Sequence, residues 1–117
     1  MASTTVLIVD DHASFRACAR RLLEREGYTV VGEAEGGASA LECARKVKPQ
    51  LALVDVYLPD TDGFEVASQL SELEGAPQVV LISSHDRAEL DPLVPGSSAR
   101  GFVPKEELSR EAIEALL

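Results

Sequence analysis

The sequence predicts a single α/β domain with a five-stranded parallel sheet in the order 2-1-3-4-5 and helices on both faces. Five short apolar runs alternate with segments in which apolar residues recur every three or four positions. Such alternation of strands and helices favours a parallel sheet with right-handed crossovers. The length of 117 residues suits one hydrophobic core, and five such units within it favour that strand order.

The predicted strands cover residues 6–9, 28–31, 51–54, 79–82 and 101–103. The first, third and fourth runs are continuously apolar, which is typical of strands buried on both faces of a sheet. Helical patterns fall within residues 15–23, 40–47, 64–73 and 112–117. Gly27 and Pro49 stand where a helix would end, and Ser109 stands where the last helix would begin.

The helical pattern is weak between residues 86 and 100, where a fourth helix would lie. Pro92 and Pro95 each remove a backbone donor and disfavour helix in the residue before them. We therefore expect a shortened or irregular fourth helix.

The composition and charge argue against two classes of protein, those that bind nucleic acid and those that span a membrane. The formal net charge of −9 argues against a nucleic-acid-binding surface. No apolar run reaches the roughly 20 residues of a membrane span, and the first residues lack a signal-peptide pattern, so we expect a cytoplasmic protein. Cys18 and Cys43 lie in predicted helices without metal-ligand spacing, and we expect both to be buried as small hydrophobes.

Polar side chains follow four of the five predicted strands. Asp10 and Asp11 follow the first strand, Asp55 the third, Ser83 the fourth and Lys105 the fifth. Ligands of such sheets bind beyond the carboxyl ends of the strands, so these side chains should share one rim. Clustered carboxylates repel one another and need a compensating cation, and oxygen ligands that leave room for phosphate indicate Mg²⁺.

This rim favours phosphoryl transfer. A carboxylate can act as a nucleophile and hold a phosphoryl group as an acyl phosphate. The reaction chiefly requires that the phosphoryl oxygens be positioned and neutralised, which Mg²⁺ and Lys105 could do. The Ser83 hydroxyl could bond a phosphoryl oxygen.

In order and spacing, these residues resemble the receiver domain of two-component response regulators, the CheY-like superfamily with its flavodoxin-like fold. The match spans residues 1–117 as one receiver domain and includes residues 58–63 after Asp55. The resemblance implies a signalling module that catalyses only its own phosphorylation and dephosphorylation. Asp55 would accept the phosphoryl group from a sensor histidine kinase or a phosphotransfer protein.

The resemblance implies further roles at the rim. Mg²⁺ would be ligated by Asp11, by Asp55 and by the main-chain carbonyl of Tyr57, with Asp10 assisting through water. Lys105 would pair with the carboxylate before transfer and with the phosphoryl group after it.

A conformational switch is also implied. Ser83 would be the switch hydroxyl, drawn inward by the phosphoryl oxygens, and Phe102 would be the switch aromatic that follows it. The surface of the fourth helix, the fifth strand and the last helix would then change for a partner.

Three departures from the family pattern are the residue after Lys105, the two prolines of the fourth helix, and the bulk of Tyr57 and His85. Glu106 follows Lys105 where many receivers have a cis proline, so no cis peptide is expected there. The ending, residues 101–109, resembles receivers fused to LuxR- or NarL-type helix-turn-helix DNA-binding domains, which implies transcription regulation. Pro92 and Pro95 disturb the usual dimer surface, which leaves the expected homodimer open.

Other polar residues have simple explanations. Asp60 and Asp62 are interpreted as turn residues, and His12 and His85 as surface or loop histidines. Tyr57 and His85 are bulky at positions that in the family influence how water reaches the acyl phosphate. Slow hydrolysis is therefore predicted.

Two rival functions remain open. A haloacid-dehalogenase-type phosphohydrolase also uses an aspartate nucleophile, Mg²⁺ and a lysine, but it expects an Asp-x-Asp pattern where this chain has Asp10-Asp11. A receiver that no longer cycles phosphate would act only as a protein-binding module. The intact set of rim residues argues against that second rival.

Overall fold

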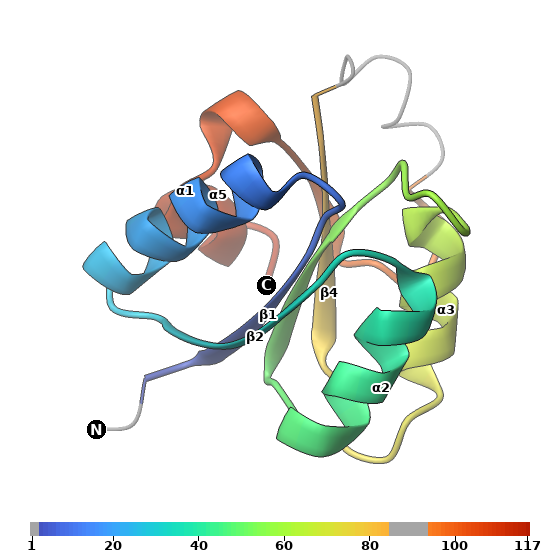
Figure 1. Cartoon of the computed structure of the whole chain (residues 1–117). Helices are drawn as coiled ribbons and strands as arrows, with labels where there is room; N and C mark the ends of the chain where they lie inside the picture. The colour runs from blue at the N-terminus through green and yellow to red at the C-terminus, as the bar shows by residue number, and fades with distance from the viewer. Residues whose placement is uncertain (1–2, 85–93) are drawn as a thin grey trace.

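The computed structural model describes residues 3–84 and 94–117. Its five strands form one parallel sheet in the order β2-β1-β3-β4-β5, which confirms the predicted topology (Figure 1). The strands are β1 (Thr5–Val9), β2 (Thr29–Ala34), β3 (Leu51–Asp55), β4 (Gln78–Ser83) and β5 (Gly101–Pro104). Each of the five coincides with a predicted apolar run and differs from it by a few residues at the ends.

Helices cover both faces of the sheet. On one face lie α1 (Ala13–Arg25) and α5 (Arg110–Glu114), and on the other lie α2 (Gly37–Val47) and α3 (Gly63–Ser71) (Figure 1). A short 3₁₀ turn, η2 (Lys105–Glu107), follows β5. Alternate residues of β1 enter opposite cores, with Leu7 packed towards α2 and α3 and Ile8 packed towards α1 and α5.

The helix boundaries follow local signals. Gly27 has a φ of 99° just after α1, a left-handed conformation that glycine adopts without strain. The side chain of Ser109 accepts a hydrogen bond from the N–H of Ala112 and caps α5, as its position predicted. Lys48 ends α2 with a φ of 46°, immediately before Pro49.

Two aspartates interpreted as turn residues are helix caps. Asp62 accepts a hydrogen bond from the N–H of Glu65 at the start of α3. Asp60 accepts hydrogen bonds from the N–H groups of Gly37 (2.9 Å) and Ala38 (3.2 Å), so it caps α2 from a different loop. The turn interpretation of Asp60 missed this contact because its two partners lie more than twenty residues earlier.

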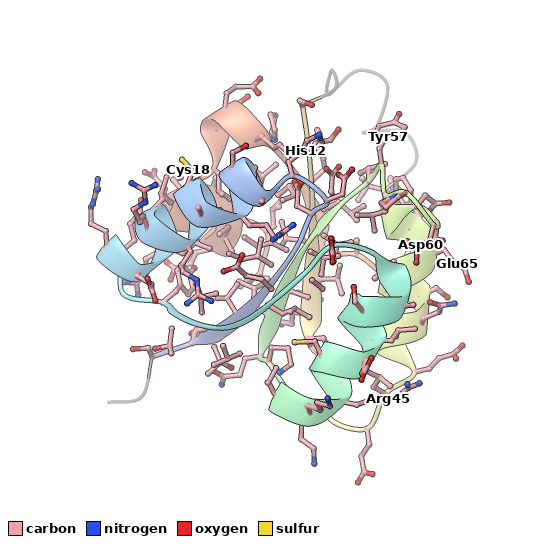
Figure 2. The ribbon with its side chains drawn as sticks, in the orientation of Figure 1. His12, Cys18, Arg45, Tyr57, Asp60 and Glu65 are labelled. Atoms are coloured by element: carbon pink, nitrogen blue, oxygen red, sulfur yellow. The ribbon has the colours of Figure 1, made fainter. Side chains whose placement is uncertain are left out.

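The cysteine prediction was wrong for Cys18. Ala19 and Leu23 of α1 are buried against the sheet, while Cys18 is exposed (Figure 2). Successive helical residues point about 100° apart, so the neighbour of a buried residue can face solvent. Cys43 is half-buried and packs against the core under α2, close to Gly32.

The predicted fourth helix falls mainly on residues 85–93, including Pro92, which lie outside the described part of the chain. Residues 94–100, including Pro95, form bends and a turn with Gly96 at a φ of 91°. No cis peptide bond occurs among the described residues, in agreement with the expectation for Glu106. Within the described ranges, no helix is long and apolar enough to cross a membrane.

Candidate functional site

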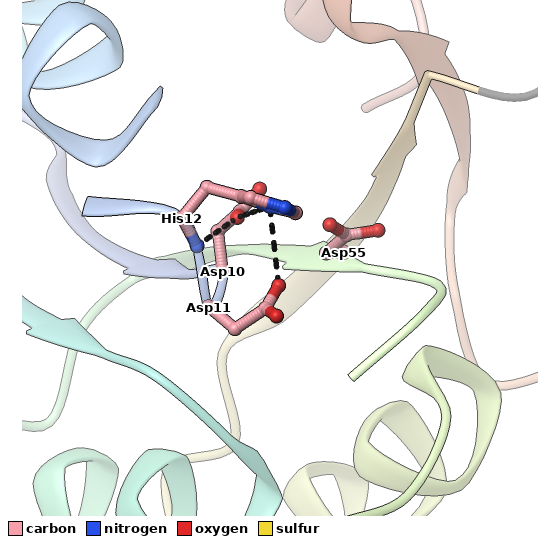
Figure 3. A group of neighbouring side chains, drawn as sticks. All are labelled: Asp10, Asp11, His12 and Asp55. Atoms are coloured by element: carbon pink, nitrogen blue, oxygen red, sulfur yellow. Dashed lines mark hydrogen bonds and ion pairs between the residues drawn. The ribbon is translucent and has the colours of Figure 1, made fainter. Parts of the chain in front are cut away.

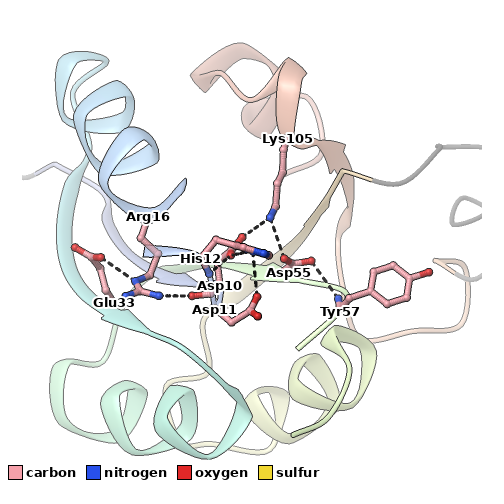
Figure 4. Close-up of polar contacts among 8 residues, drawn as sticks. All are labelled: Asp10, Asp11, His12, Arg16, Glu33, Asp55, Tyr57 and Lys105. Atoms are coloured by element: carbon pink, nitrogen blue, oxygen red, sulfur yellow. Dashed lines mark hydrogen bonds and ion pairs between the residues drawn. The ribbon is translucent and has the colours of Figure 1, made fainter. Parts of the chain in front are cut away.

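The sheet brings the predicted rim residues together. Val9 of β1 pairs with Val54 of β3, so Asp10 and Asp55 leave adjacent strands at the same level. Lys105 reaches the same place from the end of β5 (Figure 4). Strands β1, β3 and β5 of the parallel sheet thus deliver three charged groups to the same end of the sheet.

Lys105 bridges the two buried aspartates. Its Nζ lies 2.6 Å from Oδ2 of Asp10 and 3.0 Å from Oδ2 of Asp55. The same ammonium group lies 4.5 Å from the centre of the Phe15 ring, within the range of a cation–π contact. With only 13% of its side chain exposed, Lys105 is held in place by both its charge and its packing.

The two carboxylates respond differently to this shared partner. Burial acts to raise the pKa of Asp10, but Lys105 and hydrogen bonds from His12 outweigh it, so the pKa lies below its ordinary value. For Asp55, burial and the charge of Asp10 outweigh Lys105 and the Tyr57 N–H, so the pKa is raised. Burial acts to lower the pKa of Lys105, but its two carboxylate partners raise it, so the ammonium form is retained.

Asp11 and His12 complete a cluster with these two aspartates. Asp10, Asp11, His12 and Asp55 each offer one ligand atom, and these atoms lie within 4.8 Å of one another (Figure 3). Three carboxylates facing one lysine leave excess negative charge, and Asp11 is exposed enough to meet a solvated ion. This donor set fits a divalent cation.

His12 was not predicted to belong to the site. Its Nδ1 lies 3.1 Å from Oδ1 of Asp10 and 3.2 Å from Oδ1 of Asp11. The interpretation as a surface histidine holds for its exposure, with 65% of the side chain accessible, but misses these contacts. The signal in the sequence that could have placed His12 in the site was its position directly after Asp10 and Asp11. His85, the other histidine, lies outside the described residues.

Tyr57 contributes its main chain to the site. Its N–H donates a hydrogen bond to Oδ1 of Asp55 at 3.1 Å, while the residue as a whole is 49% exposed (Figure 4). A bridge between Tyr57 and Asp62 closes the loop that follows β3. The loop therefore holds the Tyr57 backbone next to Asp55.

The two predicted switch residues are both buried. Ser83 ends β4, one position beyond the Asp55–Ile82 pair in the register of β3 with β4. Phe102 lies on β5 and packs in the core that faces α2 and α3. Phe102 is thus already inside the molecule in this structure.

Arg16 and Glu33 form contacts that hold the backbone of Asp10, and these contacts were not predicted. Arg16 donates a hydrogen bond from Nη1 to the main-chain oxygen of Asp10 (2.6 Å), and its Nε pairs with Glu33 (3.1 Å). Arg20 pairs with the same glutamate at 2.8 Å. The carbonyl of the first rim aspartate is therefore tied to α1 and β2, through contacts that span too much sequence for a local motif to reveal.

The chain is similar in sequence and in structure to known proteins. The model of the response regulator receiver domain family matches residues 6–117. A transcriptional regulator of Pseudomonas aeruginosa is 43% identical over 110 residues, which make up 94% of this chain and 53% of that protein. The chain spans about half the length of the curated relatives it matches.

Two solved structures share the fold over nearly the whole chain. A LuxR-family two-component response regulator from Aurantimonas sp. SI85-9A1 is similar with a TM-score of 0.86 at 30% identity, covering 98% of this chain and 85% of that one. The signal receiver domain of the response regulator NarL from Mycobacterium tuberculosis is similar with a TM-score of 0.86 at 32% identity, covering 99% and 98% of the two chains.

Proposed function

This chain belongs to the response regulator receiver domain family of two-component signalling, and on that premise we propose that Asp55 is its phosphoacceptor. The donor is a phosphohistidine on a sensor histidine kinase or a phosphotransfer protein. One carboxylate oxygen of Asp55 attacks phosphorus, the bond from phosphorus to the imidazole nitrogen breaks, and the histidine leaves. The observation that carries the proposal is the meeting of Asp55 with Asp10, Asp11 and Lys105 from separate strand ends.

Mg²⁺ would be held by Asp11, by Asp55 and by the main-chain carbonyl of Tyr57, with Asp10 acting through water. When bound, the ion neutralises phosphoryl oxygens during transfer. The excess of carboxylates in the cluster supports this assignment.

Lys105 orients the nucleophile. Its ammonium group lies 3.0 Å from Asp55 before any transfer, and it can follow the charge onto a phosphoryl oxygen afterwards. Because Lys105 is mostly buried and also tied to Asp10, the side chain starts close to its final position. We propose that the domain catalyses only its own phosphorylation and dephosphorylation.

Ser83 and Phe102 would form the switch. The Ser83 hydroxyl bonds a phosphoryl oxygen and moves towards it, and the space beside β4 and β5 is the one that Phe102 occupies. Since Phe102 is already buried, phosphorylation would stabilise this inward arrangement and reduce excursions from it.

The readout is transcription regulation through a helix-turn-helix output domain of the LuxR or NarL type. Support comes from the relatives, which are transcriptional regulators about twice as long as this chain. The net charge of −9 is consistent with DNA contact being made by another domain.

Phosphoryl transfer is tested with a small donor. The protein is incubated with Mg²⁺ and acetyl phosphate, and its intact mass is measured over time. We expect one added phosphoryl group, which is lost in Asp55→Asn. The matched control is Asp62→Asn, which changes a nearby exposed carboxylate but keeps an oxygen that can cap α3, so labelling should continue.

The other outcomes contradict the proposal in different ways. Rapid consumption of acetyl phosphate without a labelled protein would indicate the phosphohydrolase. Absence of both labelling and turnover would indicate a binding module that does not cycle phosphate. Labelling that survives in Asp55→Asn would place the acceptor elsewhere.

A further inference from the structure

The imidazole of His12 lies beside the two aspartates that follow β1. Its Nδ1 is 3.1 Å from Asp10 and 3.2 Å from Asp11, and all four candidate ligand atoms, including one of Asp55, lie within 4.8 Å of one another (Figure 3). Two ligands that share an ion at bond lengths of about 2.0–2.2 Å lie no more than about 4.4 Å apart. The distances from Nδ1 of His12 to Asp10 and to Asp11 both satisfy this limit.

We propose that Nδ1 of His12 is a ligand of the metal ion, which makes this site selective for transition-metal ions over Mg²⁺. The inference rests on the proposed function, because it concerns the same metal site. Mg²⁺ prefers oxygen ligands and gains little from an imidazole. Mn²⁺, Co²⁺ and similar ions accept mixed nitrogen and oxygen ligands, with affinities that rise along the series.

The backbone fixes the ring beside the carboxylates. The N–H of His12 donates a hydrogen bond to Oδ1 of Asp10 at 2.8 Å, and the carbonyl of Asp10 accepts one from Arg16 at 2.6 Å. The turn that carries these residues is thus held from two sides before an ion arrives. Little rearrangement is then needed for the ring to act as a ligand.

Helix capping does not explain the position of the ring. His12 is the N-cap residue of α1, yet its side chain makes no capping hydrogen bond to the helix. The ring instead faces carboxylate oxygens. Without a metal, Nδ1 carries the proton that bonds these oxygens; as a ligand it offers a lone pair, and the proton resides on Nε2 of an imidazole that is 65% exposed.

Spectroscopy can detect the ligand directly. Mn²⁺ is added to the purified protein, and pulsed electron paramagnetic resonance records modulation from any nitrogen nucleus bound to the ion. We expect histidine nitrogen modulation in the parent, and its loss in His12→Phe, which keeps an aromatic ring but has no donor. His85→Gln is the matched control, since His85 is the only other histidine, and it should retain the signal.

Calorimetry tests the selectivity. The affinities for MgCl₂ and CoCl₂ are measured separately for the parent and for His12→Phe. Loss of a ligand should weaken Co²⁺ binding by at least about tenfold, the lower end of the effect of removing even an outer-shell partner. Mg²⁺ binding should change by no more than about twofold, because its oxygen ligands remain.

The results separate this inference from the proposed function. Nitrogen modulation that persists in His12→Phe, or equal losses of Co²⁺ and Mg²⁺ affinity, would overturn the His12 assignment and leave phosphorylation of Asp55 standing. Failure of the parent to bind any of the three ions would overturn both. Thermal unfolding of His12→Phe checks that the variant is folded, with a small loss of stability expected because the hydrogen bond from the ring to Asp10 is removed.

Discussion

Of the two buried rim carboxylates, Asp55 is the one whose charge is less compensated. Asp10 has hydrogen bonds from the backbone and ring of His12 as well as the Lys105 ion pair, and its pKa is lowered despite burial. Asp55 shares the same lysine, receives one hydrogen bond from Tyr57 and faces the charge of Asp10, so burial prevails and its pKa is raised. A cation or a change to a neutral side chain would relieve this imbalance.

Replacing Asp55 with asparagine should therefore stabilise the metal-free protein. A carboxyl group whose pKa is higher in the folded than in the unfolded chain makes folding less favourable as pH rises from the unfolded value through the folded one. Asparagine carries no such charge. We expect Asp55→Asn to be more stable than the parent by about 1 kcal/mol near pH 7, and by less near pH 4, where the parent carboxyl takes up its proton.

Urea unfolding in the presence of a chelator, at both pH values, measures this difference. Asp62→Asn serves as the comparison, because its carboxylate is exposed and the new side chain can still cap α3. An advantage of Asp55→Asn that stays the same at the two pH values would mean that the buried charge is not its cause.

The loop between β3 and α3 contacts both α2 and the start of α3. Asp60 caps α2 through the N–H groups of Gly37 and Ala38, and these bonds lower the pKa of Asp60. At the other end of the loop, the N–H of Gly63 donates to the carbonyl of Val56 at 2.8 Å, which folds the start of α3 back against the end of β3. The loop thus connects the phosphoacceptor strand to two helices.

Gly63 can be tested as the point of closest approach. A Cβ at this position would lie 2.6 Å from the carbonyl oxygen of Asp55 and 2.9 Å from Cα of Val56. Alanine normally favours a helix over glycine, yet here we expect Gly63→Ala to destabilise the protein by about 1–3 kcal/mol, the usual effect of overpacking. The labelling rate with acetyl phosphate should also fall, because the backbone of Asp55 must move.

Equilibrium unfolding of Gly63→Ala and a time course of its intact mass test both effects. Ser68→Ala, within the same helix, is the control and should change stability by less than about 1 kcal/mol. A Gly63→Ala protein as stable as the parent would show that the helix and the strand can separate at no cost.

At the scale of the whole molecule, the sheet concentrates negative charge at one end. The chain carries a formal net charge of −9, and three of its carboxylates meet at the candidate metal cluster. Charge repulsion there opposes folding. An ion that binds only the folded protein therefore raises the free energy of unfolding of the whole domain. Stability is therefore a direct measure of metal binding.

Mg²⁺ should raise the stability of the parent protein by about 2.7 kcal/mol when its free concentration is one hundred times the dissociation constant. Asp11→Asn, which removes an exposed ligand, should show a much smaller gain. Thermal or urea unfolding measures this, with NaCl at matched ionic strength as the control, because salt alone screens the acidic surface. Equal stabilisation by the two salts would argue against a specific site.

The strand order and most of the rim follow from the sequence without structural information. Continuous apolar runs mark buried strands, and parallel strands must end at a common edge, so Asp10, Asp55 and Lys105 could be predicted to meet without knowledge of a single distance. Their contacts in the structure follow from that topology. Short-range patterns are sufficient where a residue's place depends only on its position in a strand.

Contacts that depend on distance and direction became visible only in the folded structure. The cap that Asp60 gives α2 joins residues far apart in sequence, the exposure of Cys18 depends on how α1 rotates against the sheet, and the ring of His12 turns towards the aspartates rather than to solvent alone. No local pattern encodes the first two relations, because each results from packing between elements. His12 directly follows the aspartate pair in the sequence, but the direction of its ring depends on how the turn after β1 folds, and only the structure shows that direction.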